Sequence, residues 1–435
     1  MAATEFSGPL RAALTAACGA LGIAGAAARA TEVQTGAMVY TEPGRVSAFE
    51  ALADVKHEFA SGRAGTFRFV LDTLTGSSAN GAVPAATLQT FTSPSGKGSY
   101  TTEAGETPLD GTFRDTRFAV SGGLTQPWGR LTTATLGAYG SFEHDYTSLG
   151  VNAALTRDFN RRNTTVTLRA SRFADVVNPE GGIPEALGLM PAPTGGGDDD
   201  KRDDDGGGGD SRDKNVTDLG VSLTQVLSRR TLLTLNYTDS RLSGYQTDPY
   251  KLVSVVDDNG DPAPLGVYLP DLKVYLYESR PDRRHKHAVA AELIRNLGRD
   301  ILTLSYRHFD DDWGIVSNTG EVAYRLNFAT DRYLQPNFRR YHQSAADFYR
   351  RFLVDGAALP TYASADYRLG EMTALSYGLK FGTKLSGGND LTVRLEYYRQ
   401  TGEHHPDTAI GHLRDYDLFP TVDAWIANVG LTFGK

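Results

Sequence analysis

Segments in which apolar and polar residues alternate follow one another along most of the chain. The clearest spans 421–433, where Trp425, Val429 and Phe433 share one parity and the intervening residues are mostly polar or small. Successive side chains of a strand point to opposite faces, so the pattern indicates a strand with one apolar face. Fifteen earlier segments show similar patterns. They span 33–40, 46–59, 66–74, 112–126, 131–145, 148–159, 164–174, 216–228, 231–243, 283–296, 301–311, 315–328, 333–346, 372–385 and 391–400.

The connectors between these segments differ in length according to the end at which they fall. If the first strand starts at the periplasmic end, every long connector lies outside and every periplasmic turn is short. The long ones include 75–111, 175–215 and 244–282. A soluble sandwich has no reason to collect its long loops at one end, whereas outer-membrane barrels do. The pattern predicts an all-β fold: a transmembrane antiparallel up-and-down β-barrel of about sixteen strands.

Composition supports this fold class. Hydrophobic residues make up 40 % of the chain and the mean hydropathy is −0.34. No apolar run approaches the roughly 18–20 residues that a membrane helix needs, whereas alternating barrel strands are unremarkable on hydropathy. The formal net charge of −8 argues against a nucleic-acid partner.

The first thirty residues differ from the rest. Arg11 precedes an Ala/Leu/Gly-rich run, and Ala28-Arg29-Ala30 follows as an A-x-A cleavage pattern. We expect 1–30 to be an export signal and 31–435 a single barrel domain; a buried N-terminal helix is the alternative. The only cysteine, Cys18, lies in this signal, so the mature chain would have no disulfide and no thiolate metal site.

These features predict a location in the outer membrane of a Gram-negative bacterium. Lipid and lipopolysaccharide would then surround the barrel. Phe433 ends the last strand with an aromatic residue, as closing strands of such barrels do, although Gly434 and Lys435 still follow it. We therefore expect the barrel-assembly machinery to recognise this strand.

Charged residues of the polar parity are candidates for the lumen, because charge facing lipid costs a few kcal/mol at the midplane. Acids and bases are nearly balanced among them, which predicts ion-paired walls and little net ion selectivity. A one-residue bulge would reverse the assignment of a strand. The candidates are Arg68, Asp72, Asp115, Arg117, Arg169, Asp218, Glu292, Arg307, Glu321, Arg325, Arg339, Lys380, Arg394 and Glu396.

Three polar groups in the connectors or at the strand ends are candidate cation sites. The glycine-embedded acidic run 198–205, within an insert at 195–214, lacks the spacing of a calcium loop and is typical of a disordered, solvated tip. Asp310, Asp311 and Asp312 cluster in a short external turn, where they form either a charged rim or a cation site. His404, His405 and His412 share one external loop but lack a third ligand at fixed spacing. We predict no cofactor.

One pattern suggests catalysis. His342 and Ser344 fall on the lipid-facing parity, and Asn318 on the preceding strand should lie almost opposite. Serine, a histidine base and an orienting amide are the parts of a nucleophilic triad. The layout is similar to that of outer-membrane phospholipase A, although so short a motif also occurs by chance.

Several stretches resemble one bacterial family, catalogued as Domain of Unknown Function 3570 and found in Gram-negative, mainly proteobacterial, genomes. The resemblance covers nearly the whole mature chain. It implies an exported outer-membrane barrel and supplies no substrate or activity. The stretches are GRVS (44–47), SGKGSYTTEAGETPLDGTFRDTR (95–117), DYTSLGVNAALTRDFN (145–160), TQVLSRRTLLTLNY (224–237), TDPYK (247–251), YLYESRPD (275–282), QSAADFYR (343–350) and IGHLRDYDLFP (410–420).

The sequence thus predicts a non-enzymatic barrel for the passage or docking of a small polar solute. A barrel of this size encloses an aqueous channel unless its loops plug it. Two alternatives stay open. One is a closed barrel that serves a periplasmic or surface component in export or assembly, and the other is the lipid-face hydrolase.

Overall fold

The computed structural model describes residues 31–94, 98–192, 211–264, 273–385 and 387–434. The predicted export signal, 1–30, and the acidic run 198–205 lie outside the described residues. No helix among the residues described is long and apolar enough to cross a membrane.

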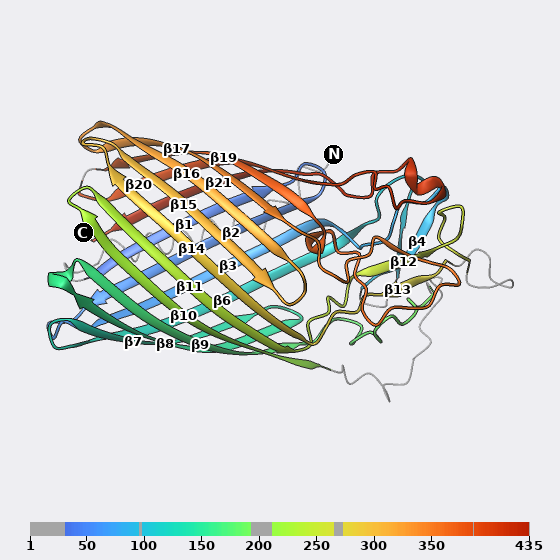
Figure 1. Ribbon diagram of the computed structural model, residues 1–435, viewed down its shortest axis with the longest axis horizontal. Coiled ribbons are helices and arrows are strands. Elements are labelled where there is room, and N and C mark those ends of the chain that lie inside the picture. Colours follow the sequence, from blue (N-terminus) through green and yellow to red (C-terminus); the bar gives the residue numbers. More distant parts are fainter. Residues whose placement is uncertain (1–30, 95–97, 193–210, 265–272, 386, 435) are drawn as a thin grey trace.

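A closed antiparallel barrel forms the body of the described structure (Figure 1). The first and last strands pair with each other, from Val33 opposite Phe433 to Thr41 opposite Trp425. The all-β barrel prediction is confirmed. In barrel order the strands are β1 (Thr31–Thr41), β2 (Val46–Glu58), β3 (Ala64–Ala79), β6 (Leu109–Trp128), β7 (Thr132–Phe142), β8 (Tyr146–Phe159), β9 (Thr164–Val177), β10 (Arg212–Ser228), β11 (Thr231–Gly244), β14 (Arg283–Asn296), β15 (Ile301–Asp311), β16 (Val316–Ala329), β17 (Arg332–Gln343), β19 (Met372–Lys384), β20 (Asp390–Gly402) and β21 (Val422–Phe433).

The two parities of the strands form two different faces, as the alternation predicted. Large apolar side chains lie exposed at alternate positions, among them Leu136, Val151 and Leu395. Directly opposed residues on the other parity are often polar, such as Glu321 across from Arg339. The shortest barrel strands have 11 residues, which at ~3.3 Å per residue and ~40° tilt rise about 28 Å, close to the ~30 Å bilayer core.

The long connections all leave the same end of the barrel and fold together there (Figure 1). We call their described residues within 80–108, 178–192, 245–282, 344–371 and 403–421 the cap. The cap stands beyond the strand ends, on the right of Figure 1. Its elements are β4 (Gln89–Thr92), β5 (Ser99–Thr102), β12 (Leu252–Val256), β13 (Tyr275–Tyr277), β18 (Phe352–Val354), η2 (Tyr367–Leu369) and η3 (Gly411–Arg414); η1 (Asn160–Arg162) lies in a turn at the other end.

Apolar packing holds the cap together. β12 is buried along its whole length, pairs antiparallel with β13 and pairs parallel with β18. One cluster joins Phe91, Leu252 and Tyr275, and a second joins Val256 to Leu413 of another loop. The connections are therefore one packed layer rather than separate loops.

The sequence prediction placed no strands in the long connectors 75–111 and 244–282, and this was wrong, because they contain β4, β5, β12 and β13. It also began the strand after the acidic insert at residue 216, whereas β10 starts at Arg212. β3 and β6 extend beyond their predicted ends, with a register shift between Gly76 and Ser78. Gly76 has φ 138°, and a Cβ there would collide with the carbonyl oxygen of Arg45, so the shift requires glycine.

The contrast between the faces leads to a first prediction. Val151→Arg, at an exposed apolar position of β8, should destabilise the barrel in phospholipid vesicles by about 2–4 kcal/mol, since it puts a cation against lipid. Asn152→Arg, one residue further along on the opposite face, should leave stability almost unchanged. Denaturant titration of the vesicle-folded protein measures both. Equal losses would mean that the two faces are not divided between lipid and lumen.

Candidate functional site

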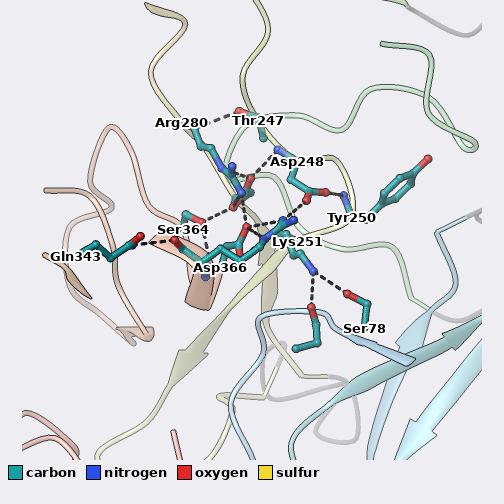
Figure 2. Close-up of polar contacts among 12 residues, drawn as sticks. Ser78, Thr247, Asp248, Tyr250, Lys251, Arg280, Gln343, Ser364 and Asp366 are labelled. Carbon is teal, nitrogen blue, oxygen red and sulfur yellow. Dashed lines mark hydrogen bonds and ion pairs between the residues drawn. The ribbon is translucent and has the colours of Figure 1, made fainter. Parts of the chain in front are cut away.

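A buried cluster of charged residues lies where the cap meets the barrel (Figure 2). The Arg280 guanidinium binds Glu278, with Nε 2.6 Å from Oε1, and Asp366, with Nη2 2.9 Å from Oδ2. The side chains of Glu278 and Asp366 are 0 % and 1 % exposed. A buried carboxylate needs such partners, because leaving water costs several kcal/mol per ion.

Arg368 adds a second contact between the two cap loops that form this cluster. Its guanidinium binds Asp366, with Nη2 2.6 Å from Oδ2, and Asp248, with Nη2 2.9 Å from Oδ2. The Asp366 carboxylate also caps η2 by accepting from the Arg368 backbone N–H. Gln343 at the end of β17 donates to the carbonyl oxygens of Arg368 and Gly370. The cluster therefore ties two cap loops, 245–282 and 344–371, to each other and to the end of β17.

Lys251 joins the cap to the other side of the barrel rim. Its side chain is buried, and its ammonium donates to the carbonyl oxygen of Ala79 and, over 3.3 Å, to the hydroxyl of Ser78. Both acceptors lie at the end of β3. Two of the three N–H donors of the ammonium are thus used, and no carboxylate of the described residues forms an ion pair with it.

The environment shifts the pKa values of these groups in different directions. Burial alone would raise the pKa of Asp366, but Arg368 and Arg280 outweigh it and hold that pKa well below its usual range. Burial raises the pKa of Glu278 to about 7, against the opposing charge of Arg280. Burial also lowers the pKa of Lys251, although Asp248 and Asp366 act the other way.

A cavity of about 350 Å³ adjoins this cluster. Its wall includes the ends of β3 and β6, the turn at Asp145, and cap residues such as Tyr250, whose hydroxyl donates to Asp145 over 2.6 Å. The volume is within the range of small-molecule sites. Its charged lining residues are Asp110, Arg114, Asp115, Asp145, Glu180, Asp248, Lys251 and Arg368. Both signs of charge are present, so the cavity suits a polar solute.

The sequence profile of a family described as "Protein of unknown function (DUF3570)" matches residues 10–433. This chain belongs to the DUF3570 family. A comparison with curated proteins found no match. The resemblance predicted from the quoted stretches is thereby confirmed.

Solved barrels show distant similarity to this DUF3570 chain. One described as a bacterial polysaccharide outer membrane secretin is 8 % identical, with 93 % of this chain and 98 % of that chain covered and a TM-score of 0.44. The siderophore receptor PirA from Acinetobacter baumannii is 10 % identical, with 86 % and 53 % covered and a TM-score of 0.41. PirA from Pseudomonas aeruginosa is also 10 % identical, with 85 % and 56 % covered and a TM-score of 0.38. The chain thus spans little more than half the length of these receptors.

The predicted lumen residues of the DUF3570 chain all lie on barrel strands, and several are brought together. Asp72 accepts from Arg117 over 2.5 Å, and Arg394 pairs with Glu396 on the same strand. Arg68 pairs with Asp54, which was not among the candidates. The expected ion pairing is present at these positions. That this face lines the lumen stays a prediction.

The three candidate metal ligands of the external turn do not converge on one point. The Asp311 carboxylate accepts from the Arg284 guanidinium and from the backbone N–H groups of Trp313 and Ile315. Asp312 accepts from the backbone N–H of His285 over 2.8 Å. These bonds shape the turn. Asp310 lies on the opposite face of β15 from Asp311.

The strand register brings two members of the candidate triad, Asn318 and His342, opposite each other, but the three side chains do not hydrogen-bond to one another. Asn318 lies directly opposite His342, as predicted. However, His342 Nδ1 lies 3.1 Å from Thr373 Oγ1, the Ser344 hydroxyl donates to the Gly314 carbonyl oxygen, and Asn318 accepts from Tyr306 and His308. No hydrogen bond of the described residues links two of the three groups. The arrangement gives no support to a hydrolase.

Sequence reasoning missed the charged cluster itself. The loop stretches 247–251 and 275–282, which carry part of the family resemblance, contain Asp248, Lys251, Glu278 and Arg280. Charged residues within loop stretches that resemble the family were the available signal. Their partners Asp366 and Arg368 lie far along the chain, and no spacing rule connects them.

The charged cluster leads to a prediction about the stability of the cap. Asp366→Asn leaves Arg280 buried without the carboxylate that it shares with Arg368, and breaking a buried pair costs about 3–5 kcal/mol. Limited proteolysis in detergent should cut the cap faster while the barrel stays folded. Because the pKa of Asp366 is lowered in the fold, the unaltered protein should lose the same stability as the pH falls below the ordinary value of 3.8.

The control for this prediction is Asp355→Asn, which alters an exposed aspartate just after β18. It should leave the proteolysis rate unchanged at every pH. Equal rates for the Asp366 and Asp355 variants would show that the charged cluster does not hold the cap in place.

Proposed function

We propose that this DUF3570 chain is an outer-membrane barrel of a Gram-negative bacterium that docks a small polar solute under its cap and passes it through the barrel. The closed sheet, the exposed apolar face and the strand lengths support a membrane location. Lipid and lipopolysaccharide then surround the wall. The barrel-assembly machinery engages β21, which ends in Phe433.

The cavity between the cap and the strand ends is the observation that carries the docking proposal. Its lining combines Arg114, Lys251 and Arg368 with five acidic residues and the Tyr250 ring. Lys251 keeps one N–H donor beyond those bound to Ala79 and Ser78. A solute with hydroxyl, amide or mixed charged groups finds both donors and acceptors there.

The polar face of the wall supports passage without strong ion selectivity. The pairs Arg117–Asp72, Arg68–Asp54 and Arg394–Glu396 neutralise one another. Glu321 lies opposite Arg339 in the register of β16 and β17. A wall of paired charges attracts neither ion sign strongly.

The second candidate is a closed barrel that acts as the partner of a periplasmic or surface component in export or assembly. The packing of the cap favours it, since Val256, Ala409 and Leu413 form a shared apolar core between loops. A firmly packed cap could bind a partner protein on its surface as well as form the entrance to the barrel. No enzymatic activity is proposed.

Single-channel conductance of the refolded protein in a planar bilayer, measured in KCl, is the first test. We expect steady steps from an open aqueous pore. Replacing Arg307, Arg325 and Arg339 together by Gln removes three cations from successive strands and should shift the reversal potential toward cation preference. A folded barrel that never conducts would exclude passage and leave the closed-barrel candidate.

A second test addresses the cavity. Thr112→Trp places a large ring at an exposed position of the cavity lining, so it should lower the conductance and slow the swelling of glucose-loaded liposomes. Leu359→Trp, at an exposed cap position away from the cavity, is the matched control. Identical conductance and swelling in the two variants would rule out a route through this cavity.

A further inference from the structure

Two histidines and an aspartate meet on the outer wall of the barrel, near the external ends of β11 and β14. His285 and His287 are two residues apart on β14, so their side chains share a face. Asp239 on β11 lies directly opposite His287 in the register. The group belongs neither to the cap cavity nor to the polar face of the wall.

The nitrogen and oxygen atoms of this group converge. Asp239 Oδ2 lies 2.6 Å from His285 Nε2 and 3.4 Å from His287 Nδ1. The two imidazole centroids are 4.2 Å apart, and one ligand atom from each residue lies within 4.8 Å of the others. Tetrahedral ligands at ~2.0–2.1 Å from a zinc ion are themselves about 3.3 Å apart, so small side-chain rotations would bring the three atoms to ligand positions.

From this geometry we infer that Asp239, His285 and His287 form a binding site for a borderline divalent transition-metal ion, with Zn²⁺ the ion that we assign. Two imidazoles and one carboxylate are a ligand set that Zn²⁺ favours over Ca²⁺ or Mg²⁺, which take oxygen ligands. The ion replaces the hydrogen bond between Asp239 and His285. The remaining coordination positions are left to water.

The neighbouring side chains are compatible with a bound cation. Arg241 Nε lies 3.2 Å from Oδ1 of Asp239 and leaves Oδ2 to the site; a second hydrogen bond of this kind orients a ligating carboxylate. The Tyr237 hydroxyl lies 3.0 Å from His287 Nδ1, and a bound ion takes the place of this hydrogen bond at the nitrogen. Asp310 of β15, the strand on the other side of β14, lies opposite His287 in the register. Its negative charge offsets the positive charge of Arg241.

The side chains of His285 and His287 are 37 % and 34 % exposed, whereas that of Asp239 is 14 % exposed. The site is therefore open to an ion from outside while its carboxylate is held in place. A bound ion would join β11 to β14 at the rim, on either side of the long connection 245–282. This inference does not depend on whether a solute passes through the barrel.

Isothermal titration calorimetry with ZnCl₂ tests the site on the full, untagged mature chain in detergent, with excess CaCl₂ present to occupy the oxygen-rich sites. We expect one Zn²⁺ per chain. His285→Ala, His287→Ala and Asp239→Asn should each weaken binding by at least about tenfold, because each removes a ligand. Saturating Zn²⁺ should also raise the unfolding temperature of the unaltered chain, since the ion binds only the folded state.

His404→Ala is the matched control, because it removes a histidine that also contacts a carboxylate, Asp417, over 2.8 Å. It should bind Zn²⁺ as the unaltered chain does. Heat-modifiable migration on gels checks that every variant is folded. The inference is wrong if the unaltered chain shows no saturable binding, or if folded variants of the three ligands bind as tightly as the control.

Discussion

Closure of the sheet is the constraint on which the rest of the structure depends. In a bilayer no water is available to bond exposed backbone groups, so every strand needs a partner on both sides. The pairing of β21 with β1, from Phe433 to Trp425, supplies the last of these partners. Once the sheet is closed, each strand has one lipid-side and one inner face. The sequence has to alternate in step with them.

Closure also determines where the cap forms. Neighbouring strands are antiparallel, so every second connection along the chain lies at the same end of the barrel. The long ones meet there and bury apolar side chains against one another, as Val256 and Leu413 do. Charged groups trapped at the junction then need partners. Arg280, shared between Glu278 and Asp366, meets that need and joins two cap loops. Hydrogen bonds of Gln343 and Lys251 then hold the cap against the ends of β17 and β3.

The barrel could be predicted from the sequence because its signal is local. The segment 301–311 coincides with β15 (Ile301–Asp311), since alternation and turn residues suffice to define a strand. The cap could not be predicted in this way. β12 is buried on both sides and therefore does not alternate, and its parallel partner β18 lies in another loop. Its pairing depends on tertiary contacts that no period in the sequence records.

The candidate sites also divide into features that local sequence signals predict and features that depend on tertiary contacts. Register allowed Asn318 to be placed opposite His342, because a hairpin fixes it. The hydrogen bonds that these side chains make instead, such as that of His342 with Thr373 on β19, depend on the next strand and were not foreseeable. The histidines of β14 were missed for the same reason. Asp239, the carboxylate they face, lies on β11, beyond the long connection between them.

The outer wall itself shows where the apolar belt ends. On three strands a tyrosine of the outer parity places its hydroxyl against a polar side chain on the next strand. The pairs are Tyr237–His287, Tyr306–Asn318 and Tyr397–Asp423. Tyrosine suits the interface, where its ring meets lipid and its hydroxyl meets water. We therefore expect the boundary between lipid and water to run between these rings and their partners.

The position of this boundary determines whether water can reach the group formed by Asp239, His285 and His287. Tyr237 lies two residues below Asp239 on β11, so the carboxylate and the two imidazoles lie just on the wet side of the aromatic level. Deeper in the bilayer the same three groups would face hydrocarbon and their burial would be costly. Higher up they would be cap residues surrounded by other charges. Only at this level can water and ions reach a polar group that the barrel wall still holds in fixed register.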